Sequence, residues 1–263
     1  MDTLFHERRR PASLPRVDAL DSWTRSEHTA DVGGRPTTHP VWRKGSGPGV
    51  VVVHEMPGLT TGVIRFGEEL VAAGYTVLLP HLFGPVAREF SNLDVARTMP
   101  SICVSREFTK LASGVTTPVA GWLRSLARDL HAELGGPGVG ALGMCFTGGF
   151  ALAMMVDDST VAPVVCQPSV PFIGSAARAA DLNLSPADAD VVRRRAGEGC
   201  AVLGIRYASD PLVGRRFDTL TSLIGDAFIR VELDGRGHST VTEHRSQVAV
   251  DAVLAFFAQR LHA

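Results

Sequence analysis

A chain of 263 residues, of which 45% are hydrophobic and 20% charged, can bury a large core and has an ordinary length for one α/β domain. Its formal net charge of -1 gives no electrostatic reason to expect nucleic acid or an anionic membrane as a partner. We therefore expect a single domain over residues 1–263 that acts on a small molecule, as a monomer or a homodimer.

The N-terminal stretch MDTLFHERRRPASLP is charged, contains proline and lacks the apolar segment of a secretory signal, so a cytoplasmic location is expected. Residues 139–156 carry no charge and are long enough to span a bilayer, but glycines interrupt them. We interpret this stretch as a buried strand, a turn and a helix, and expect no membrane span. The 4 cysteines show no C-x-x-C spacing, which predicts free thiols and gives no reason to expect a metal or a cofactor.

Apolar, β-branched runs alternate along the chain with helical periods, a pattern typical of a mostly parallel sheet covered by helices on both faces. In the N-terminal region, residues 1–45, two alternating stretches flank a Gly-Gly pair, and we expect a hairpin that packs on the sheet. A strand at 49–55, a helix at 63–73 and a strand at 75–80 follow. The pair Thr117-Pro118 then predicts a helix N-cap and first position.

Four more strands are expected in the C-terminal half, at 139–142, 161–167, 200–207 and 228–233, and a helix at 243–261 closes the chain. With the hairpin this makes about eight strands. The segments 90–116 and 168–199 are expected to lie over the carboxyl edge of the sheet, where open α/β sheets bind ligands, and to shape the pocket.

One of these strands ends in the sequence GALGMCFTGG, with Cys145 at its centre. A strand that ends at Gly143 and a helix that begins just after Cys145 require a sharp reversal, the nucleophile elbow G-x-Nu-x-G. The unpaired N–H groups and the dipole of the following helix would stabilise a thiolate or an oxyanion there. The alternative is that Cys145 is one more small residue packed in a core.

Two further candidates follow later strands, in the chain order nucleophile, acid, histidine that this fold class uses. Asp210 lies in ASDPL and His238 lies in DGRGHST. Asp210 has an alternative role as a helix N-cap, and His238 has one as a solvated turn residue. Asp234 competes with Asp210 as the partner of the histidine, but it belongs to an Asp-Gly turn signal.

The strand VVVHE brings a carboxylate to the same edge of the sheet. Glu55 ends a fully apolar run, so it must be hydrogen-bonded or have a raised pKa. Near Cys145 it could accept the proton of the thiol or hold the thiol neutral. His54 points to the opposite side and is expected to be a core histidine with a fixed tautomer.

Together these motifs resemble the dienelactone hydrolase family, a branch of the α/β-hydrolase fold with a cysteine nucleophile. The matching segments are HEMPGL, PHLFG, GMCFTGG, SDPLV and GHS. The resemblance implies a triad of Cys145, His238 and Asp210, with Glu55 pairing with the thiol in the resting enzyme. It also implies that the backbone N–H groups of Met56 and Phe146 form the oxyanion hole.

The sequence departs from the family pattern in three places. Thr147 stands where the family usually has glycine. Family members that act on dienelactones clamp the substrate carboxylate with two arginines, but Pro85 and Thr242 follow the motifs where arginines are expected. Four arginines are possible substitutes: Arg88, Arg106, Arg206 and Arg236. We take Arg106 and Ser239 as candidates for substrate binding.

These features predict a hydrolase that cleaves a carboxylic ester or lactone through a thioester acyl-enzyme and needs no cofactor. Because the arginine clamp is not recognisable, a non-catalytic protein that binds a small ligand on the same fold is the main alternative. A redox-sensing thiol protein is a second alternative, although no other cysteine lies near Cys145 in the sequence.

Overall fold

The computed structural model describes residues 19–108, 113–170 and 175–262, so the N-terminal stretch discussed above lies outside the described residues. Its centre is one eight-stranded sheet with the order β1-β2-β4-β3-β5-β6-β7-β8. The strands are β1 (Thr24–Asp31), β2 (Pro36–Lys44), β3 (Gly49–Val53), β4 (Thr76–Pro80), β5 (Val139–Met144), β6 (Thr160–Cys166), β7 (Val202–Tyr207) and β8 (Phe228–Leu233). The six strands from β4 to β8 are parallel, which confirms the expected α/β-hydrolase architecture.

The expected hairpin is part of the sheet itself. β1 pairs with β2, and β2 pairs with β4, both in antiparallel register, so the hairpin extends one edge of the parallel strands. Val41 of β2 is buried, whereas most of β1 is exposed. The hairpin therefore protects the edge of β4 by pairing with it.

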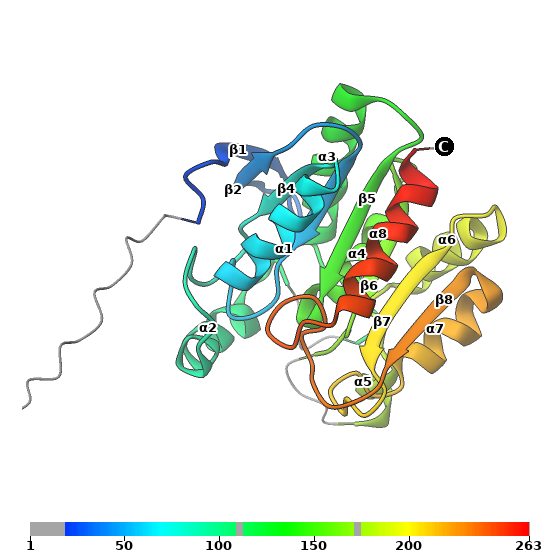
Figure 1. The fold of residues 1–263 in the computed structure, drawn as a ribbon. Coiled ribbons are helices and arrows are strands. Elements are labelled where there is room, and N and C mark those ends of the chain that lie inside the picture. The colour runs from blue at the N-terminus through cyan, green and yellow to red at the C-terminus, as the bar shows by residue number, and fades with distance from the viewer. Residues whose placement is uncertain (1–18, 109–112, 171–174, 263) are drawn as a thin grey trace, which may run out of the picture.

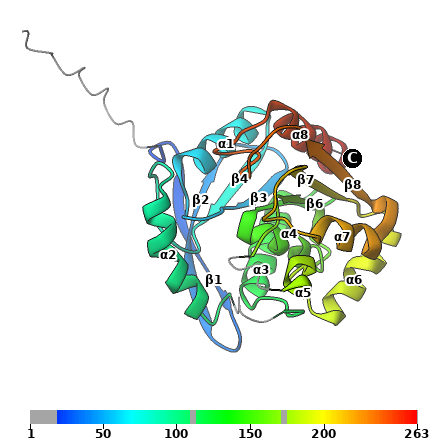
Figure 2. The ribbon, with the colours of Figure 1, turned by 90° about the horizontal axis from the view of Figure 1, so that it is seen from below.

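Helices cover both faces of the sheet (Figures 1 and 2). One face carries α1 (Thr61–Ala72) and α8 (Gln247–Leu261). The other carries α3 (Val119–Leu134), α4 (Gly148–Met154), α6 (Pro186–Gly197) and α7 (Arg216–Ile224). The two segments expected to lie over the carboxyl edge contain α2 (Asn92–Val104) and, ahead of α6, the short α5 (Ala176–Ala180).

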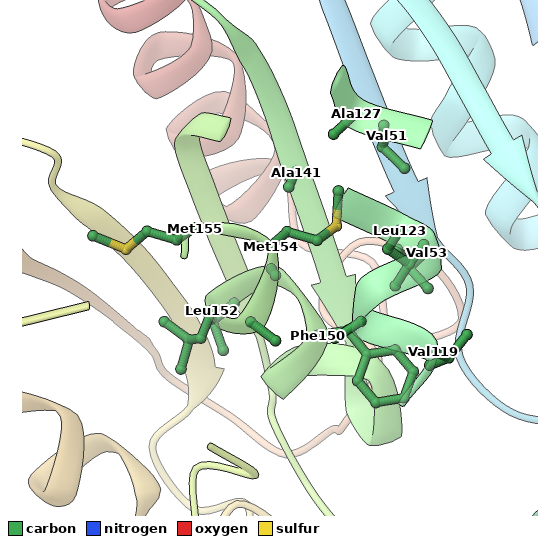
Figure 3. Packing of buried hydrophobic residues seen from close by; sticks show 14 of the residues in the cluster. Val51, Val53, Val119, Leu123, Ala127, Ala141, Phe150, Leu152, Met154 and Met155 are labelled. Carbon is green, nitrogen blue, oxygen red and sulfur yellow. The ribbon is translucent and has the colours of Figure 1, made fainter. Parts of the chain in front are cut away.

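Every residue of β3 is apolar and buried. Its alternate side chains enter two separate cores: Val50 and Val52 face α1 and α8, and Val51 and Val53 face α3 and α4. Figure 3 shows part of the second core, with Val51 and Val53 near Leu123 of α3 and other residues of α3 and α4 close by. A strand buried on both faces has no polar side to alternate with.

Three helix starts differ from the prediction: α1 begins at Thr61, two residues early, and two later helices begin late. Thr117 does not cap α3, because its hydroxyl donates to the carbonyl of Glu107 at 2.7 Å and the helix begins at Val119 without a side-chain cap. The last helix begins at Gln247 instead of residue 243. Residues 239–246 form a turn held by its own backbone hydrogen bonds, and the hydroxyls of Ser239 and Thr242 donate to Glu55. Both late starts come from contacts between distant segments.

Residues 139–156 form the expected strand, turn and helix. β5 lies in the middle of the sheet, and α4 is entirely buried. Among the described residues, no helix is long and apolar enough to cross a membrane.

Candidate active site

The turn that carries Cys145 joins β5 directly to a short 3-10 helix, Cys145–Thr147, and then to α4. Cys145 has a φ of 53°, in the left-handed region that non-glycine residues rarely adopt and that often marks functional sites. A Cβ on Gly143 would lie 2.2 Å from the carbonyl oxygen of Thr147, and one on Gly148 would lie 2.8 Å from Pro168. The neighbouring glycines are therefore required for the sharp reversal.

Thr147 fills the position where glycine was expected and forms hydrogen bonds there. Its buried hydroxyl accepts from the Met144 N–H at 3.1 Å and lies 3.0 Å from the carbonyl oxygens of both Val53 and Met144. The side chain thus ties the end of β5 to the end of β3. The departure from the family pattern is accommodated by specific contacts.

His238 and Asp210 come together as the sequence predicts. His238 Nδ1 lies 2.7 Å from Asp210 Oδ2, and the Asp210 side chain is only 2% exposed. The other carboxylate oxygen of Asp210 accepts from the Leu212 N–H at 3.0 Å, so the residue also holds the turn after β7. The competing carboxylate, Asp234, is exposed.

The imidazole of His238 lies between this carboxylate and the thiol. Since Nδ1 is bonded to Asp210, Nε2 is the nitrogen that remains, and it is buried without a hydrogen-bond partner. Donor atoms of Glu55, Cys145 and His238 all lie within 4.8 Å of one another. Burial alone would lower the pKa of His238, but the Cys145 thiolate and the Asp210 carboxylate outweigh it and raise the pKa to about 11.

Glu55 is buried and hydrogen-bonded, as expected for a carboxylate at the end of an apolar strand. Thr242 and Ser239 donate to its two oxygens, Ser239 at 2.9 Å, and the Gln167 amide lies 3.5 Å away. Burial raises the pKa of Glu55, although the hydrogen bond from Thr242 and the nearby His238 partly oppose the shift. The structure places Ser239, a substrate-binding candidate, in this buried network.

Sequence reasoning missed two polar residues that follow β6. The Ser169 hydroxyl lies 3.2 Å from Cys145 Sγ, and its N–H donates to the Cys145 carbonyl at 2.9 Å. The Gln167 side-chain oxygen accepts from the N–H and the hydroxyl of Thr240, at 3.2 and 2.7 Å. Their position directly after a buried strand, like that of Glu55, was the available signal.

Met56 and Phe146, the candidates for the oxyanion hole, follow neighbouring strands. β3 and β5 pair in parallel, with Val53 beside Gly143, so both residues lie just beyond the same edge of the sheet. Phe146 occupies the turn between Cys145 and α4, where backbone N–H groups at a helix start point away from the helix.

His54 has the structural role that its strand position indicated. It is fully buried, its Nδ1 lies 3.0 Å from the Glu55 carbonyl, and its Nε2 accepts from the Leu82 N–H at 3.1 Å. These partners fix the tautomer with the proton on Nδ1. Burial and the neighbouring His81 lower the pKa of His54 to about 3.

Comparison with known proteins identifies the family of this chain. A model of the dienelactone hydrolase family matches residues 37–183, more than half of the chain. The chain belongs to the dienelactone hydrolase family. It is therefore a hydrolase of the α/β-hydrolase fold.

Solved structures show the same fold at low sequence identity. A putative dienelactone hydrolase from Klebsiella pneumoniae has a TM-score of 0.58 and 16% identity, covering 90% of this chain and 99% of its own. A dienelactone hydrolase-like promiscuous phosphotriesterase from metagenomic libraries has a TM-score of 0.58 and 18% identity. The match covers 91% of this chain and 99% of that protein. A cold-adapted esterase from an Arctic intertidal metagenomic library has a TM-score of 0.57 and 16% identity. The match covers 99% of this chain and 100% of that protein. No curated protein matches the sequence.

The four arginines named as possible substitutes for a carboxylate clamp lie in different surroundings. Arg106 lines a separate pocket beside the hairpin with Arg35 and Thr37, and that pocket includes no residue of the Cys145 cluster. Arg88 pairs with Asp94 at 3.4 Å, Arg206 pairs with Glu232 at 2.5 Å, and Arg236 is exposed. Among the described residues, none of these four arginines hydrogen-bonds to Glu55, Cys145 or His238.

A fifth arginine, which sequence reasoning missed, is almost fully buried in this chain. Arg216 begins α7 and donates to the carbonyl oxygens of Leu212, Val213 and Arg178 at 3.3, 2.9 and 2.5 Å. Burial lowers its pKa, while the charges of Asp181 and Cys145 oppose the shift. Its hydrogen bonds hold the turn that contains Asp210 against α5.

Proposed function

We propose that this protein cleaves a carboxylic ester or lactone through a thioester formed on Cys145, with His238 and Asp210 completing the triad. The observation that supports this most strongly is the position of the His238 ring. One nitrogen lies 2.7 Å from the buried Asp210 carboxylate, and the other is unbonded near the Cys145 thiol. A base oriented by an acid beside a nucleophile is the arrangement that acyl transfer requires.

In the first half-reaction His238 takes the proton of the thiol, and the Cys145 thiolate attacks the carbonyl carbon. The resulting oxyanion accepts hydrogen bonds from the N–H groups of Met56 and Phe146, each of which contributes about 3 kcal/mol to the transition state. His238 then donates its proton to the leaving alkoxide, and the acyl group stays on sulfur. For a lactone the alcohol remains attached to the acyl group.

In the second half-reaction a water molecule attacks the thioester. His238 accepts the proton of the water, the tetrahedral intermediate collapses, and the thiolate leaves and is reprotonated. Because a thiolate is a strong nucleophile but the thioester must still be hydrolysed, we expect activated or strained substrates such as lactones to react faster than unstrained alkyl esters. Similar rates on both classes would contradict this preference.

Glu55 supports the resting state in this proposal. Its carboxyl group is buried close to the thiol, and two negative charges so close together in a buried site repel each other. A neutral Glu55 and a thiolate, or an ionised Glu55 and a neutral thiol, are therefore the favoured combinations. Glu55 thus restrains the thiol until substrate changes the local charge. The reaction needs no cofactor and is expected to take place in the cytoplasm.

The test is hydrolysis of a panel of p-nitrophenyl esters and five- and six-membered lactones, with and without a carboxylate, by the wild type, Cys145→Ser and Cys200→Ser. Cys200 is half-buried ahead of β7 and serves as the matched thiol control. We expect the rate of hydrolysis to fall at least about a hundredfold in Cys145→Ser and to stay unchanged in Cys200→Ser. Full activity of Cys145→Ser on every substrate would refute thiol catalysis. No activity of the wild type on any member would favour the non-catalytic binding protein.

A further inference from the structure

Three different donor atoms converge beside the nucleophile: a carboxylate oxygen of Glu55, the sulfur of Cys145 and an imidazole nitrogen of His238. All three lie within 4.8 Å of one another, and no other such group of three occurs among the residues that the structure describes. We propose that Glu55, Cys145 and His238 form a binding site for Zn²⁺, and that the ion inhibits the enzyme reversibly by occupying it.

His238 has the environment of a metal ligand. Histidines that bind metals usually donate their second ring N–H to a carboxylate, which fixes the tautomer and makes the ligating nitrogen more basic. His238 Nδ1 does this with Asp210 at 2.7 Å, and Nε2 is buried with no hydrogen-bond partner. Nε2 is therefore the ring nitrogen that could bind a cation beside Cys145.

Cys145 supplies the ligand that selects zinc over magnesium or calcium. Thiolate and imidazole ligands suit zinc, whereas magnesium and calcium prefer oxygen. Cys145 is half-buried, and the Ser169 hydroxyl lies 3.2 Å from its sulfur. A bond to the metal is stronger than this neutral contact with Ser169 and would replace it.

Glu55 completes the set with an oxygen ligand that is already fixed in place. Its hydrogen bonds from Ser239, Thr242 and Gln167 hold the carboxylate, as carboxylates that bind metals are usually held. Zinc-to-ligand distances of about 2.0–2.3 Å place two ligands of a tetrahedral ion about 3.3–3.6 Å apart. The three donors lie within 4.8 Å of one another, so they must move closer together when the ion binds.

The same geometry explains why the ion would inhibit. Zinc bonded to Cys145 Sγ and His238 Nε2 occupies the nucleophile and the base together, so neither can act on an ester. Binding releases the proton that the thiol and the imidazole share, and therefore strengthens as pH rises. The site itself rests on geometry alone, whereas the inhibition rests on the proposed function.

Zinc binding is measured first on the wild-type protein, without any substitution. The protein is titrated with ZnCl2 against a chromophoric chelator, and the rate of alkylation of Cys145 by iodoacetamide is followed by peptide mapping. We expect one ion per chain and at least tenfold slower alkylation of Cys145, about 1.4 kcal/mol in protection, with no change at Cys200. EDTA should restore the original rate. Unchanged alkylation at saturating zinc would overturn the proposal.

Variants then assign the ligands. We expect Cys145→Ser and Glu55→Gln to weaken zinc binding at least tenfold and Cys200→Ser to leave it unchanged. Equal affinity in all three variants would place the ion elsewhere and contradict the proposed ligands. If Glu55→Gln does not fold, alkylation of the wild-type protein with and without zinc still tests whether the ion binds at Cys145.

The two proposals fail in different ways. Loss of ester hydrolysis in Cys145→Ser without any zinc protection would support the hydrolase and reject the zinc site. Zinc protection of Cys145 in a protein that cleaves no substrate of the panel would support the site and reject the hydrolase. Zinc protection together with full esterase activity at saturating zinc would reject inhibition.

Discussion

The thiol of Cys145 has a neighbour that a triad of cysteine, histidine and aspartate does not include. The Ser169 hydroxyl lies 3.2 Å from the sulfur, and its backbone N–H bonds to the Cys145 carbonyl. A hydroxyl that donates to a thiolate stabilises the charged form, and hydrogen bonds to charged groups contribute about 1.5–3 kcal/mol. Ser169 is therefore a positioning residue for the nucleophile.

Replacing Ser169 by alanine should weaken the nucleophile without removing it. We expect kcat/KM for p-nitrophenyl esters to fall about tenfold, because the thiolate loses its hydroxyl donor. The pH profile of Cys145 alkylation by iodoacetamide should shift toward higher pH. A profile identical to that of the wild type would show that the contact has no effect on thiolate formation.

Asp210 fixes the orientation of His238, so its removal should affect the rate more than substrate binding. In Asp210→Asn the amide can present an N–H to Nδ1, which selects the wrong tautomer, and we expect kcat to fall about 10³–10⁴-fold with a small change in KM. The pKa of His238 should also fall, because a negative partner is lost. Steady-state kinetics measures the first effect. A change confined to KM would argue against an orienting role.

At the scale of elements, Thr147 joins two strand ends that carry different parts of the site. Its hydroxyl links the Met144 N–H at the end of β5 to the Val53 carbonyl at the end of β3, two residues before Glu55. The elbow and the strand that leads to Met56 are thus held together by one side chain. A glycine at this position would provide none of these bonds.

Replacing Thr147 by valine, which has the same shape but no hydroxyl, should lower the free energy of unfolding by about 1–3 kcal/mol, because buried polar groups lose their partner. Thr147→Ser retains the hydroxyl, so its free energy of unfolding should fall less than that of the valine variant. Urea denaturation of the three proteins measures the difference. Equal stability of the valine variant and the wild type would show that these bonds contribute nothing net.

The elements show where sequence reasoning works and where it stops. The apolar runs predicted the strands, and the glycines around Cys145 predicted the elbow, because local sequence largely determines both. The start of α8 could not be predicted, because Ser239 and Thr242 donate their hydroxyls to Glu55, far away in the sequence. Ser169 and Gln167 were missed for the same reason, since their partners Cys145 and Glu55 are also far away in the sequence.

At the scale of the whole molecule, the parallel strands bring Glu55, Cys145, Asp210 and His238 to one edge of the sheet from four separate segments. The chain order of the nucleophile, acid and histidine predicted this meeting, since successive strands of a parallel sheet end at the same edge. The substrate could not be predicted in the same way. It depends on the shape of loops whose packing is set by distant contacts.

Acid should destabilise the fold because His54 is buried as a neutral imidazole. Its pKa is about 3 in the folded protein, whereas a free histidine side chain has a pKa of 6.5, so below about pH 6.5 the unfolded chain binds a proton that the folded chain does not. This contribution to stability is present above pH 6.5 and is lost as pH falls toward 3. Between pH 7.5 and 5.5 it amounts to about 1.4 kcal/mol.

The comparison of wild type with His54→Gln isolates this contribution from that of other titrating groups such as His81, whose pKa is also lowered by burial. Urea unfolding at pH 7.5 and 5.5 should show that the variant loses about 1.4 kcal/mol less than the wild type over this interval. An equal loss in both proteins would mean that His54 is already protonated in the folded state or makes no difference.

The central claim is that an acyl group is transferred to the sulfur of Cys145, and direct trapping tests it best. The wild type is mixed with p-nitrophenyl acetate, quenched in acid during turnover and mapped by mass spectrometry. The account predicts an acetyl group on the peptide that contains Cys145, removable by hydroxylamine, and no turnover once Cys145 is alkylated. Acylation of another residue, or turnover that persists with Cys145 fully alkylated, would contradict it.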